Sequence, residues 1–415
     1  MKFRLVLTLL ITLAIPTANA VTPIKVIPTA TTMNFSLGTN SSISKSFYTS
    51  AGLLVVGSID ETGNQQLIPG SILGKNDGFI AKIAVDGKLI WGLRLGGEFD
   101  DIATSVAVDA DNSFWVLGAS ESIVALTKIE SSAVVINPDS VTVIRESNRN
   151  SGLLTTVIWH ISAVGELLGT MKYQSITPIM PRDLAISPDG LLIISDQMAS
   201  TGRVSEITFC NFLGNCSATN KIGLRDTSLR AIVRNKDGTY FVIGKSIDSI
   251  LKTKLVGTSD GVILTLNNKG VLKSVVRSSL PKSFRTWETV SDSYLLGGLA
   301  TSSSNKEAAI TQFNQSAKPL WSMRIASNIG ALTAGSGAVL VAKGGVPTLI
   351  NWKPKSGTVM FLEFDSKGTI KIARTLNGAQ LPIAISYQKG LGYSIITQSG
   401  VESEYSATFV PSSLN

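Results

Sequence analysis

The sequence predicts an all-β fold, a seven-bladed β-propeller of four-stranded antiparallel blades, from three observations. First, a segment of alternating apolar residues and tight turns recurs about every 50 residues. Second, each copy contains two hairpins, which form a four-stranded meander that cannot bury both of its faces without neighbours. Third, charged residues make up 16% of the chain and hydrophobic residues 44%, a balance typical of many short strands rather than of long exposed helices.

The first hairpin of the repeat is clearest in GFIAKIAVDGKLIWGLRL, which lies within residues 77–118. Apolar residues alternate from Phe79 to the turn at Asp86 and Gly87, and they alternate again from Leu89 onward. Glycine suits such a turn because it adopts a positive φ without a steric cost. Copies of this hairpin are predicted at residues 156–173, 204–224, 261–278, 308–325 and 358–375.

The second hairpin of the repeat supplies the two inner strands of each blade. In SVAVDADNSFWVLG, residues 105–110 are predicted as the innermost strand and residues 113–119 as the next one. Strands at 156–162 and 166–173 then complete that blade after a long connection. Six further sets of strands begin near Ile43, Asp183, Leu229, Phe284, Gly330 and Gln380, so seven blades are expected.

The last set has only three strands, at 380–386, 391–398 and 403–410. Residues Thr31 to Asn40 have the apolar spacing of an outermost strand, but no partner strand precedes them. We therefore expect this N-terminal strand to complete the last blade and close the ring, because an unpaired edge strand is a liability. A frayed N-terminal tail is the alternative.

Several of these motifs resemble a known repeat. The stretches GFIAKI, DGKLIW, LGGEFDD and SVAVDADNSFWVLG are similar to the bacterial β-propeller repeat of the SBBP type. The resemblance is close over Asp77 to Gly118, partial between residues 182 and 246, and limited to the general pattern after residue 280. It implies a propeller fold and an extracellular role. It implies no activity, because the repeat occurs in proteins of diverse or unknown function.

Residues 1–20 form a predicted leader. A basic start at Lys2 and Arg4 is followed by a short apolar run and by the small residues Ala18 and Ala20. This pattern predicts a secretory signal peptide that is cleaved after Ala20, with an uncleaved membrane anchor as the alternative. The mature chain is therefore expected to be secreted, either extracellular or periplasmic.

Residues 21–415 are predicted to form one propeller domain, monomeric and without a transmembrane segment. Removal of Lys2 and Arg4 lowers the formal net charge from +8 to +6, and this excess is too small and scattered to predict nucleic-acid binding.

The domain contains a long inserted connection at 121–153. Strand-like runs at 133–136 and 141–144 predict an extra hairpin over one face of the ring, and a plain exposed insertion is the alternative.

The candidate binding residues lie in connections that are predicted on one face of the ring. This face carries the connections from the second to the third strand of a blade, which vary widely in length, and those from the fourth strand to the next blade. Charged residues in the latter are expected around the mouth of the central channel, where they bind a polar ligand or, alternatively, cap strands and pair between blades. These candidates are Glu98, Asp100, Asp101, Arg182, Asp183, Arg225, Asp226 and Arg285.

Two further features stand out. Trp352, in NWKPKSG, lies in a variable connection, where it either stacks on a sugar ring or tucks under its own loop.

Cys210 and Cys216, in FCNFLGNC, flank a hairpin turn of the third blade and are the only cysteines of a chain with an export signal, which predicts a disulfide. Two cysteines without a nearby histidine do not complete a zinc site.

The favoured function is a non-enzymatic secreted or cell-surface scaffold that binds an unidentified protein, peptide or glycan through the variable face. The alternative is an extracellular propeller enzyme acting on carbohydrate, a glycosidase or lyase, with Asp101 and either Asp183 or Asp226 as its carboxylates. The single histidine, His160, is expected inside a strand without a G-x-S-x-G motif, so a serine hydrolase is not predicted. No cofactor and no metal are predicted, because Asp109–Asn112 is explained as a turn.

Overall fold

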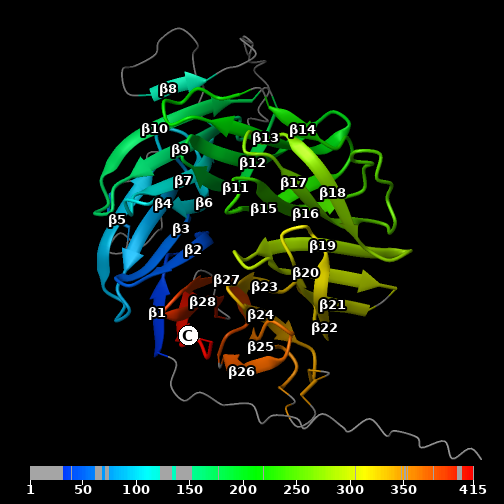
Figure 1. Ribbon diagram of the computed structural model, residues 1–415. Coiled ribbons are helices and arrows are strands. Elements are labelled where there is room, and N and C mark those ends of the chain that lie inside the picture. Colours follow the sequence, from blue (N-terminus) through cyan, green and yellow to red (C-terminus); the bar gives the residue numbers. More distant parts are fainter. Residues whose placement is uncertain are drawn as a thin grey trace, which may run out of the picture.

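The computed structural model describes residues 31–38, 40–60, 68–70, 74–121, 133–136, 152–175, 177–217, 219–303, 305–346, 348–349, 352, 354–376, 378–399 and 404–414. In this part of the chain, seven sheets follow one another around a central axis, as Figure 1 shows. The predicted seven-bladed β-propeller is therefore confirmed. No helix long and apolar enough to cross a membrane occurs in the described residues. The predicted signal peptide, residues 1–20, lies outside the described residues.

The first three blades each run outward from the central axis in chain order. Blade 1 contains β2 (Ser42–Thr49), β3 (Gly52–Asp60), β4 (Asn76–Ile83) and β5 (Leu89–Leu95). Blade 2 contains β6 (Asp101–Val108), β7 (Phe114–Ser120), β9 (Thr155–Ile161) and β10 (Leu167–Gln174). Blade 3 contains β11 (Ile179–Ser187), β12 (Gly190–Ala199), β13 (Gly202–Cys210) and β14 (Asn220–Ile222).

The remaining blades repeat this order, and only the last one departs from it. Blade 4 contains β15 (Thr227–Arg234), β16 (Tyr240–Ser246), β17 (Asp260–Leu266) and β18 (Leu272–Ser278). Blade 5 contains β19 (Ser283–Val290), β20 (Leu295–Ser302), β21 (Asn305–Phe313) and β22 (Pro319–Ala326). Blade 6 contains β23 (Leu332–Ala334), β24 (Gly337–Ala342), β25 (Thr358–Phe364) and β26 (Ile370–Leu376). Blade 7 contains β27 (Leu381–Gln388), β28 (Gly392–Gln398), β29 (Glu404–Val410) and β1 (Thr31–Ser36).

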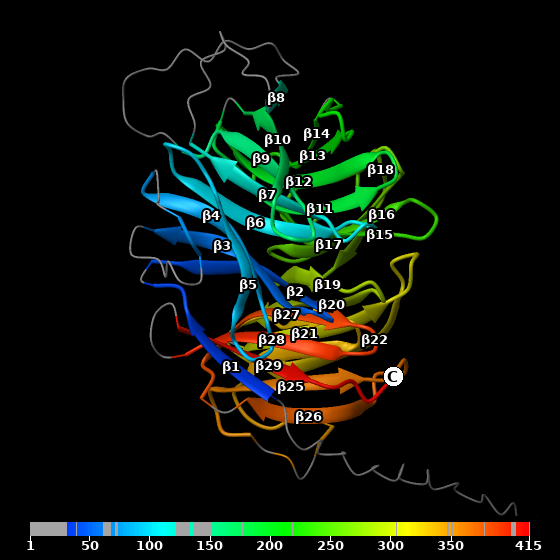
Figure 2. The same ribbon diagram turned by 90° about the vertical axis from the view of Figure 1, so that its left-hand side faces the viewer.

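The ring closes through β1, as the sequence predicts. This strand pairs antiparallel with β29, so that Met33 lies opposite Ala407, and Figure 2 shows the two strands together in the last blade. Met33 and Leu37 are buried in the hydrophobic cluster between blades 7 and 1. The strand contributes backbone pairing to one blade and apolar contacts to the next. It thereby covers an edge that would otherwise be unpaired.

Part of the long connection in blade 2 adds a fifth strand to that sheet. β8 (Ala133–Ile136) pairs in parallel with β10, with Ala133 opposite Thr170. The predicted run at 133–136 is therefore an edge strand of blade 2 rather than a cover over one face of the ring. It lies at the outer edge of the blade, where the free backbone groups of β10 offer it partners. The second predicted run, residues 141–144, lies outside the described residues.

The hydrophobic core is divided into clusters between neighbouring blades, one for each of the seven interfaces among the described residues. Alternation explains this division, because successive residues of a strand point to opposite faces of its sheet. In β3, Leu53 and Val55 belong to the cluster with blade 7, whereas Leu54 and Val56 belong to the cluster with blade 2. Each blade therefore depends on both of its neighbours for burial.

The glycine of the first hairpin contributes to this packing as well as to its turn. Gly165 has a φ of +90°, and a Cβ atom there would lie 2.6 Å from the ring of Trp91 in the preceding blade. Gly368 stands in the same relation to Trp321. Both tryptophans therefore pack against the next blade, and glycine is required twice, for its backbone conformation and for its missing side chain.

Candidate functional site

The innermost strands of all seven blades surround a cavity of about 750 Å³ on the central axis. These strands are β2, β6, β11, β15, β19, β23 and β27. Their first residues lie at the face of the ring that carries the connections between blades, which we name the connection face. A cavity of this size fits the usual range for small-molecule sites.

A β-bulge occurs at the equivalent position of six innermost strands, near the connection face. The register shifts lie between Ile43 and Lys45 and at the corresponding places in β6, β11, β15, β19 and β27, whereas β23 has none. A bulge re-aims the side chain of the extra residue. All six extra residues line the cavity: Ser44, Thr104, Arg182, Arg230, Glu288 and Ile383.

Asp183 connects four blades at the wall of this cavity. Its Oδ1 atom accepts hydrogen bonds from Lys45 Nζ at 2.6 Å and from Ser105 Oγ at 2.6 Å. Its Oδ2 atom accepts the backbone N–H of Ile232 at 3.1 Å. Lys45 also donates to Ser105 at 3.0 Å. Because its donors come from blades 1, 2 and 4, this buried carboxylate stabilises the arrangement of the channel wall.

Arg182 is held in place by a hydrogen bond from only one of its three guanidinium nitrogens. Its Nε atom donates to Asp196 Oδ2 at 2.8 Å, and Asp196 is itself buried and accepts a hydrogen bond from Ser205 and another from Ser228. Burial lowers the pKa of Arg182, Asp196 opposes this effect, and the nearby positive charge of Arg230 adds to it. The two terminal nitrogens of Arg182 make no recorded hydrogen bond within the described part of the chain. They are free to donate to a ligand in the cavity.

Arg230 occupies the bulge of the next blade and faces Glu288. The Nε atom of Arg230 lies 3.6 Å from Glu288 Oε2, which is beyond hydrogen-bond distance, and Thr286 Oγ1 donates to Glu288 Oε1 at 2.9 Å. Both side chains are about a quarter to a third exposed. The Arg230 Nε atom is buried and lacks a hydrogen-bond acceptor among the described residues. Glu288 therefore pairs with Arg230 only at long range.

The opposite side of the cavity carries several apolar side chains. Blades 6 and 7 contribute Leu332, Ile383 and Ile385 to the wall, and Phe47 of blade 1 continues this side. The arginines of blades 3 and 4 thus lie across the cavity from these apolar side chains, among which polar residues such as Thr333 and Ser386 also line the wall. Such a site is suited to a ligand that joins an anionic group to an apolar body.

The acidic residues of the loop after blade 1 do not line this cavity. Glu98 is exposed, and Asp100 accepts the backbone N–H groups of Lys75 and Asn76 at 2.8 and 3.1 Å. Asp101 is buried and accepts the backbone N–H of Gly97 at 2.9 Å. Burial raises the pKa of Asp101 to about 6, against the lowering effect of its hydrogen bonds with Gly97 and Ser120. Asp100 and Asp101 thus act as loop caps in this structure.

We expect the Asp101→Asn variant to gain stability over the wild type as the pH rises. The folded-state pKa of Asp101 is about 6 against an ordinary value of 3.8, so the folded state holds its proton longer and loses stability as pH rises through this window. The difference in unfolding free energy between variant and wild type should grow by up to about 3 kcal/mol between pH 4 and pH 7. Urea unfolding at both pH values measures it, and a difference independent of pH would contradict the prediction.

Asp226 and Arg285, which the sequence also suggested as binding residues, contact different protein groups away from the cavity. Asp226 pairs with Lys245 at 2.8 Å and lies 3.7 Å from Arg203. Arg285 is buried, donates to Ser278 at 2.6 Å and stacks over the ring of Trp287. Burial, and then the charge of Arg324, lower the pKa of Arg285 to about 10. Of the predicted charged candidates, only Arg182 and Asp183 line the cavity.

Trp352 is half-buried in the connection between β24 and β25. It packs against the cluster that contains Val346 and Leu349, both buried residues of the same connection. Trp352 therefore tucks under its own loop, which is one of the two placements that the sequence suggested. It is not among the residues that line the cavity. A role in ligand stacking stays a prediction.

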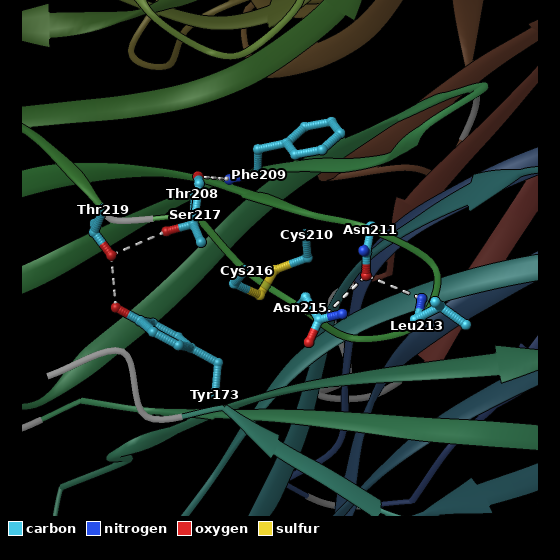
Figure 3. Close-up of a disulfide and its surroundings, with 10 residues drawn as sticks. All are labelled: Tyr173, Thr208, Phe209, Cys210, Asn211, Leu213, Asn215, Cys216, Ser217 and Thr219. Atoms are coloured by element: carbon cyan, nitrogen blue, oxygen red, sulfur yellow. Dashed lines mark hydrogen bonds between the residues drawn. A yellow bond between two sulfur atoms is a disulfide. The ribbon is translucent and has the colours of Figure 1, made fainter. Parts of the chain in front are cut away.

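Cys210 and Cys216 form the predicted disulfide, and their backbones pair across the turn between β13 and β14. Figure 3 shows the bond above Tyr173, with Asn211 Oδ1 accepting the N–H groups of Leu213 and Asn215 inside the enclosed turn. A cross-link over six positions restricts only a short loop of the unfolded chain. Its expected contribution is therefore near the low end of the usual range, about 2 kcal/mol.

Asp109–Asn112 form the predicted turn, in which the backbone N–H of Asn112 donates to the carbonyl oxygen of Asp109 at 3.0 Å. Asp109 accepts the indole N–H of Trp115 at 3.0 Å, and Asp111 accepts the backbone N–H of Ser113 at 2.8 Å. His160 stacks on Trp115, with ring centroids 3.9 Å apart. No cluster of three or more potential metal ligands occurs among the residues that the structure describes.

The sequence analysis missed four charged residues that line the cavity: Lys45, Arg230, Glu288 and Asp292. Lys45, Arg230 and Glu288 were passed over because they lie within predicted innermost strands rather than in connections between blades. If the blade sequences are aligned with one another, Arg230 and Glu288 occupy the same position as Ser44, Thr104, Arg182 and Ile383. Two arginines and a glutamate at one position are unusual for the interior of a strand. The signal was therefore present, but only in comparison between blades.

The fold and the cavity define a seven-bladed β-propeller with a ligand-sized central channel. No protein-family model and no curated protein matches the sequence, so the resemblance to SBBP-type repeats stays a prediction. Among solved structures, the chain is similar to the Pan2 WD40 domain of Neurospora crassa, with 10% identity over 72% of each chain and a TM-score of 0.40. It is similar to a protein of unknown function from Bacteroides caccae, with 14% identity, 72% of this chain and 90% of that chain covered, and a TM-score of 0.35.

A third similar structure is BBS1N in complex with ARL6DN, with 10% identity, 94% of this chain and 96% of that chain covered, and a TM-score of 0.41. These neighbours are diverse, and all are distant. They carry no argument about a ligand or an activity.

Proposed function

We propose that this protein is a non-enzymatic binding propeller that takes an anionic, partly apolar ligand at the connection-face mouth of its central channel. One observation carries the proposal: Arg182 and Arg230 project from neighbouring bulges into a cavity whose opposite side presents the apolar side chains of Leu332, Ile383 and Ile385. Guanidinium groups match the geometry of carboxylate and phosphate oxygens. A peptide with an acidic side chain, a peptide carboxyl terminus or an acidic sugar has the required chemistry.

Pre-organisation supports this proposal. Asp196 fixes the orientation of Arg182, and the network around Asp183 fixes the backbone of the strand that carries it. Little side-chain freedom would then be lost when a ligand binds. We further propose that binding takes place outside the cytoplasm, on the strength of the leader pattern in residues 1–20.

The carbohydrate-enzyme alternative has weaker support. A glycosidase needs one carboxyl group that donates a proton and a second that acts as a base or nucleophile on the same bond. Asp101, Asp183 and Asp226 were the candidates, and each accepts hydrogen bonds or ion pairs from protein groups. Only Asp183 lines the cavity.

Paired glycan and peptide arrays test the proposal. Labelled wild type should select ligands that carry a carboxylate or phosphate, and Arg230→Gln should bind them about 10 to 100 times more weakly, because a charge-assisted hydrogen bond contributes about 1.5–3 kcal/mol. The exposed Arg234, at the other end of the same strand, provides the matched control Arg234→Gln, which should bind like the wild type.

Selection of neutral ligands, or equal binding by the two variants, would overturn the channel site. A panel of glycoside substrates belongs in the same experiment. Turnover that is lost in Asp183→Asn would favour the enzyme instead.

A further inference from the structure

Apolar and basic side chains are exposed together on the connection face of blades 3 to 5. Leu224 is 68% exposed, Leu251 54% and Leu280 51%. They come from three connections, at residues 223–226, 247–259 and 279–282. We name their combined exposed residues the leucine–lysine surface: Leu224, Leu251, Lys252, Lys254, Leu255, Val256, Leu280 and Lys282.

The three connections are joined to one another by hydrogen bonds. The Asp248 carboxylate accepts the backbone N–H groups of Leu224 and Arg225, at 3.1 Å each, which links the first connection to the second. The backbone N–H of Thr258 donates to the carbonyl oxygen of Ser283 at 2.7 Å, which links the second to the third. The leucine–lysine surface is therefore one continuous region.

A buried arginine holds the longest of these connections in place. The side chain of Arg277, in β18, is 3% exposed and pairs with Asp260 at 3.1 Å. It also donates to the carbonyl oxygen of Thr253 at 3.2 Å and to that of Asp248. The buried guanidinium of Arg277 thus fixes the backbone carbonyl groups of Asp248 and Thr253, which lie on either side of Leu251. The exposed leucine is presented by an ordered turn.

That turn keeps residues that its backbone conformation disfavours. Leu251 and Lys252 have φ values of 46° and 63°, between the mutually bonded Ile250 and Thr253. Lys282 in the third connection has a φ of 60°. Asn-Gly is the usual sequence for a two-residue turn with positive φ at both positions, and other side chains cost energy there. The presence of an exposed leucine and two lysines at such positions indicates that these side chains serve a binding surface.

The charge of this surface is positive. The two acidic residues in these connections are engaged, Asp248 with backbone donors and Asp226 with Lys245, and Asp260 at the start of β17 pairs with Arg277. Lys252, Lys254 and Lys282 are exposed and form no ion pair among the residues that the structure describes. The partner of the surface should therefore be negatively charged.

We propose that the leucine–lysine surface binds an anionic phospholipid bilayer. Single leucines at the tips of turns can enter the boundary of the acyl chains, while the adjacent lysines stay at the level of the lipid phosphates. A bilayer accepts such scattered apolar side chains without a matching pocket. The proposal concerns membrane attachment of the ring and does not depend on the channel site.

Vesicle co-sedimentation tests the proposal with a variant that keeps the fold. Wild type should bind phosphatidylcholine vesicles that contain about 30% phosphatidylglycerol, and binding should weaken in about 0.5 M NaCl. The double variant Leu251→Asn/Lys252→Gly installs the favoured turn sequence, so its Tm should equal or exceed that of the wild type. Its vesicle binding should fall about ten-fold or more, because an apolar anchor and a phosphate partner are lost.

Two controls complete the design. Leu213→Asn removes a leucine that is 77% exposed in the turn after β13, which lies on the opposite face, and it should bind vesicles like the wild type. Arg230→Gln should do the same, which separates this surface from the channel site.

Wild-type binding that does not exceed binding to pure phosphatidylcholine would overturn the proposal. Equal binding by wild type and the double variant would also overturn it. Binding of a polyglutamate peptide in place of vesicles would assign the surface to an acidic protein partner instead.

Discussion

Deletion of residues 21–40 from a chain that starts after Ala20 should lower the Tm by about 5–10 °C. The deletion removes β1, and with it the backbone pairing to β29 and the buried side chains of Met33 and Leu37. Each buried apolar side chain contributes roughly 1.5–3 kcal/mol, and the exposed edge of β29 adds unpaired backbone groups. A total loss of roughly 5–10 kcal/mol corresponds to this shift in a domain of nearly 400 residues.

Two point variants provide a sharper form of this test. Met33→Asp places a charge in the cluster between blades 7 and 1 and should cost several kcal/mol, since Met33 is 5% exposed. Thr32→Asp changes the exposed neighbour in the same strand and should alter the unfolding free energy by less than about 0.5 kcal/mol. Calorimetry of all three variants measures the effects. An unchanged transition after the deletion would mean that closure by β1 does not stabilise the ring.

Glu363→Gln should lower the unfolding free energy by about 3 kcal/mol or more. Glu363 is fully buried in β25, and its carboxylate accepts hydrogen bonds from the Tyr393 hydroxyl at 2.9 Å and the Ser412 hydroxyl at 2.6 Å. It also accepts the backbone N–H of Ser413 at 2.9 Å and the Ser413 hydroxyl at 2.5 Å. These donors attach residues 411–414 and blade 7 to blade 6. An amide presents N–H groups to some of these donors and leaves buried groups unpaired.

The matched control is Glu404→Gln, because Glu404 is exposed in β29 and its replacement should cost less than about 0.5 kcal/mol. Combining Glu363→Gln with Ser412→Ala and Ser413→Ala should cost less than the sum of the separate effects, since the substitutions remove the same hydrogen bonds. Urea unfolding measures each free energy. Full additivity would show that Glu363 does not act through these serines.

The repeat architecture could be predicted because its signals are local. Alternation of apolar residues and a glycine turn are visible in GFIAKIAVDGKLIW, and both features form within one hairpin. The closing strand could also be predicted, because the count of strands in the last blade left one place empty. The disulfide followed from two cysteines on either side of one turn. In each case the partners are close in sequence or are identified by counting.

The candidate site was predicted only in part. Arg182 and Asp183 were expected at the channel and line it, whereas Asp100 and Asp101 hold a loop. Loop position alone could not separate these roles, because a carboxylate that caps backbone N–H groups and one that faces a cavity look alike in sequence. The structure separates them by their hydrogen-bond donors.

By itself, the sequence determined the seven antiparallel blades, the closure of the ring by β1 and the face that carries the variable connections, because strand period and turn chemistry act over a few residues. Only the tertiary structure decided which charges meet at the channel. Bulges in the innermost strands turn Arg182, Arg230 and Glu288 toward the axis, and Asp183 finds its donors in blades 1, 2 and 4. Such contacts join residues 49 to 138 positions apart, so packing of the blades decides them rather than any local pattern.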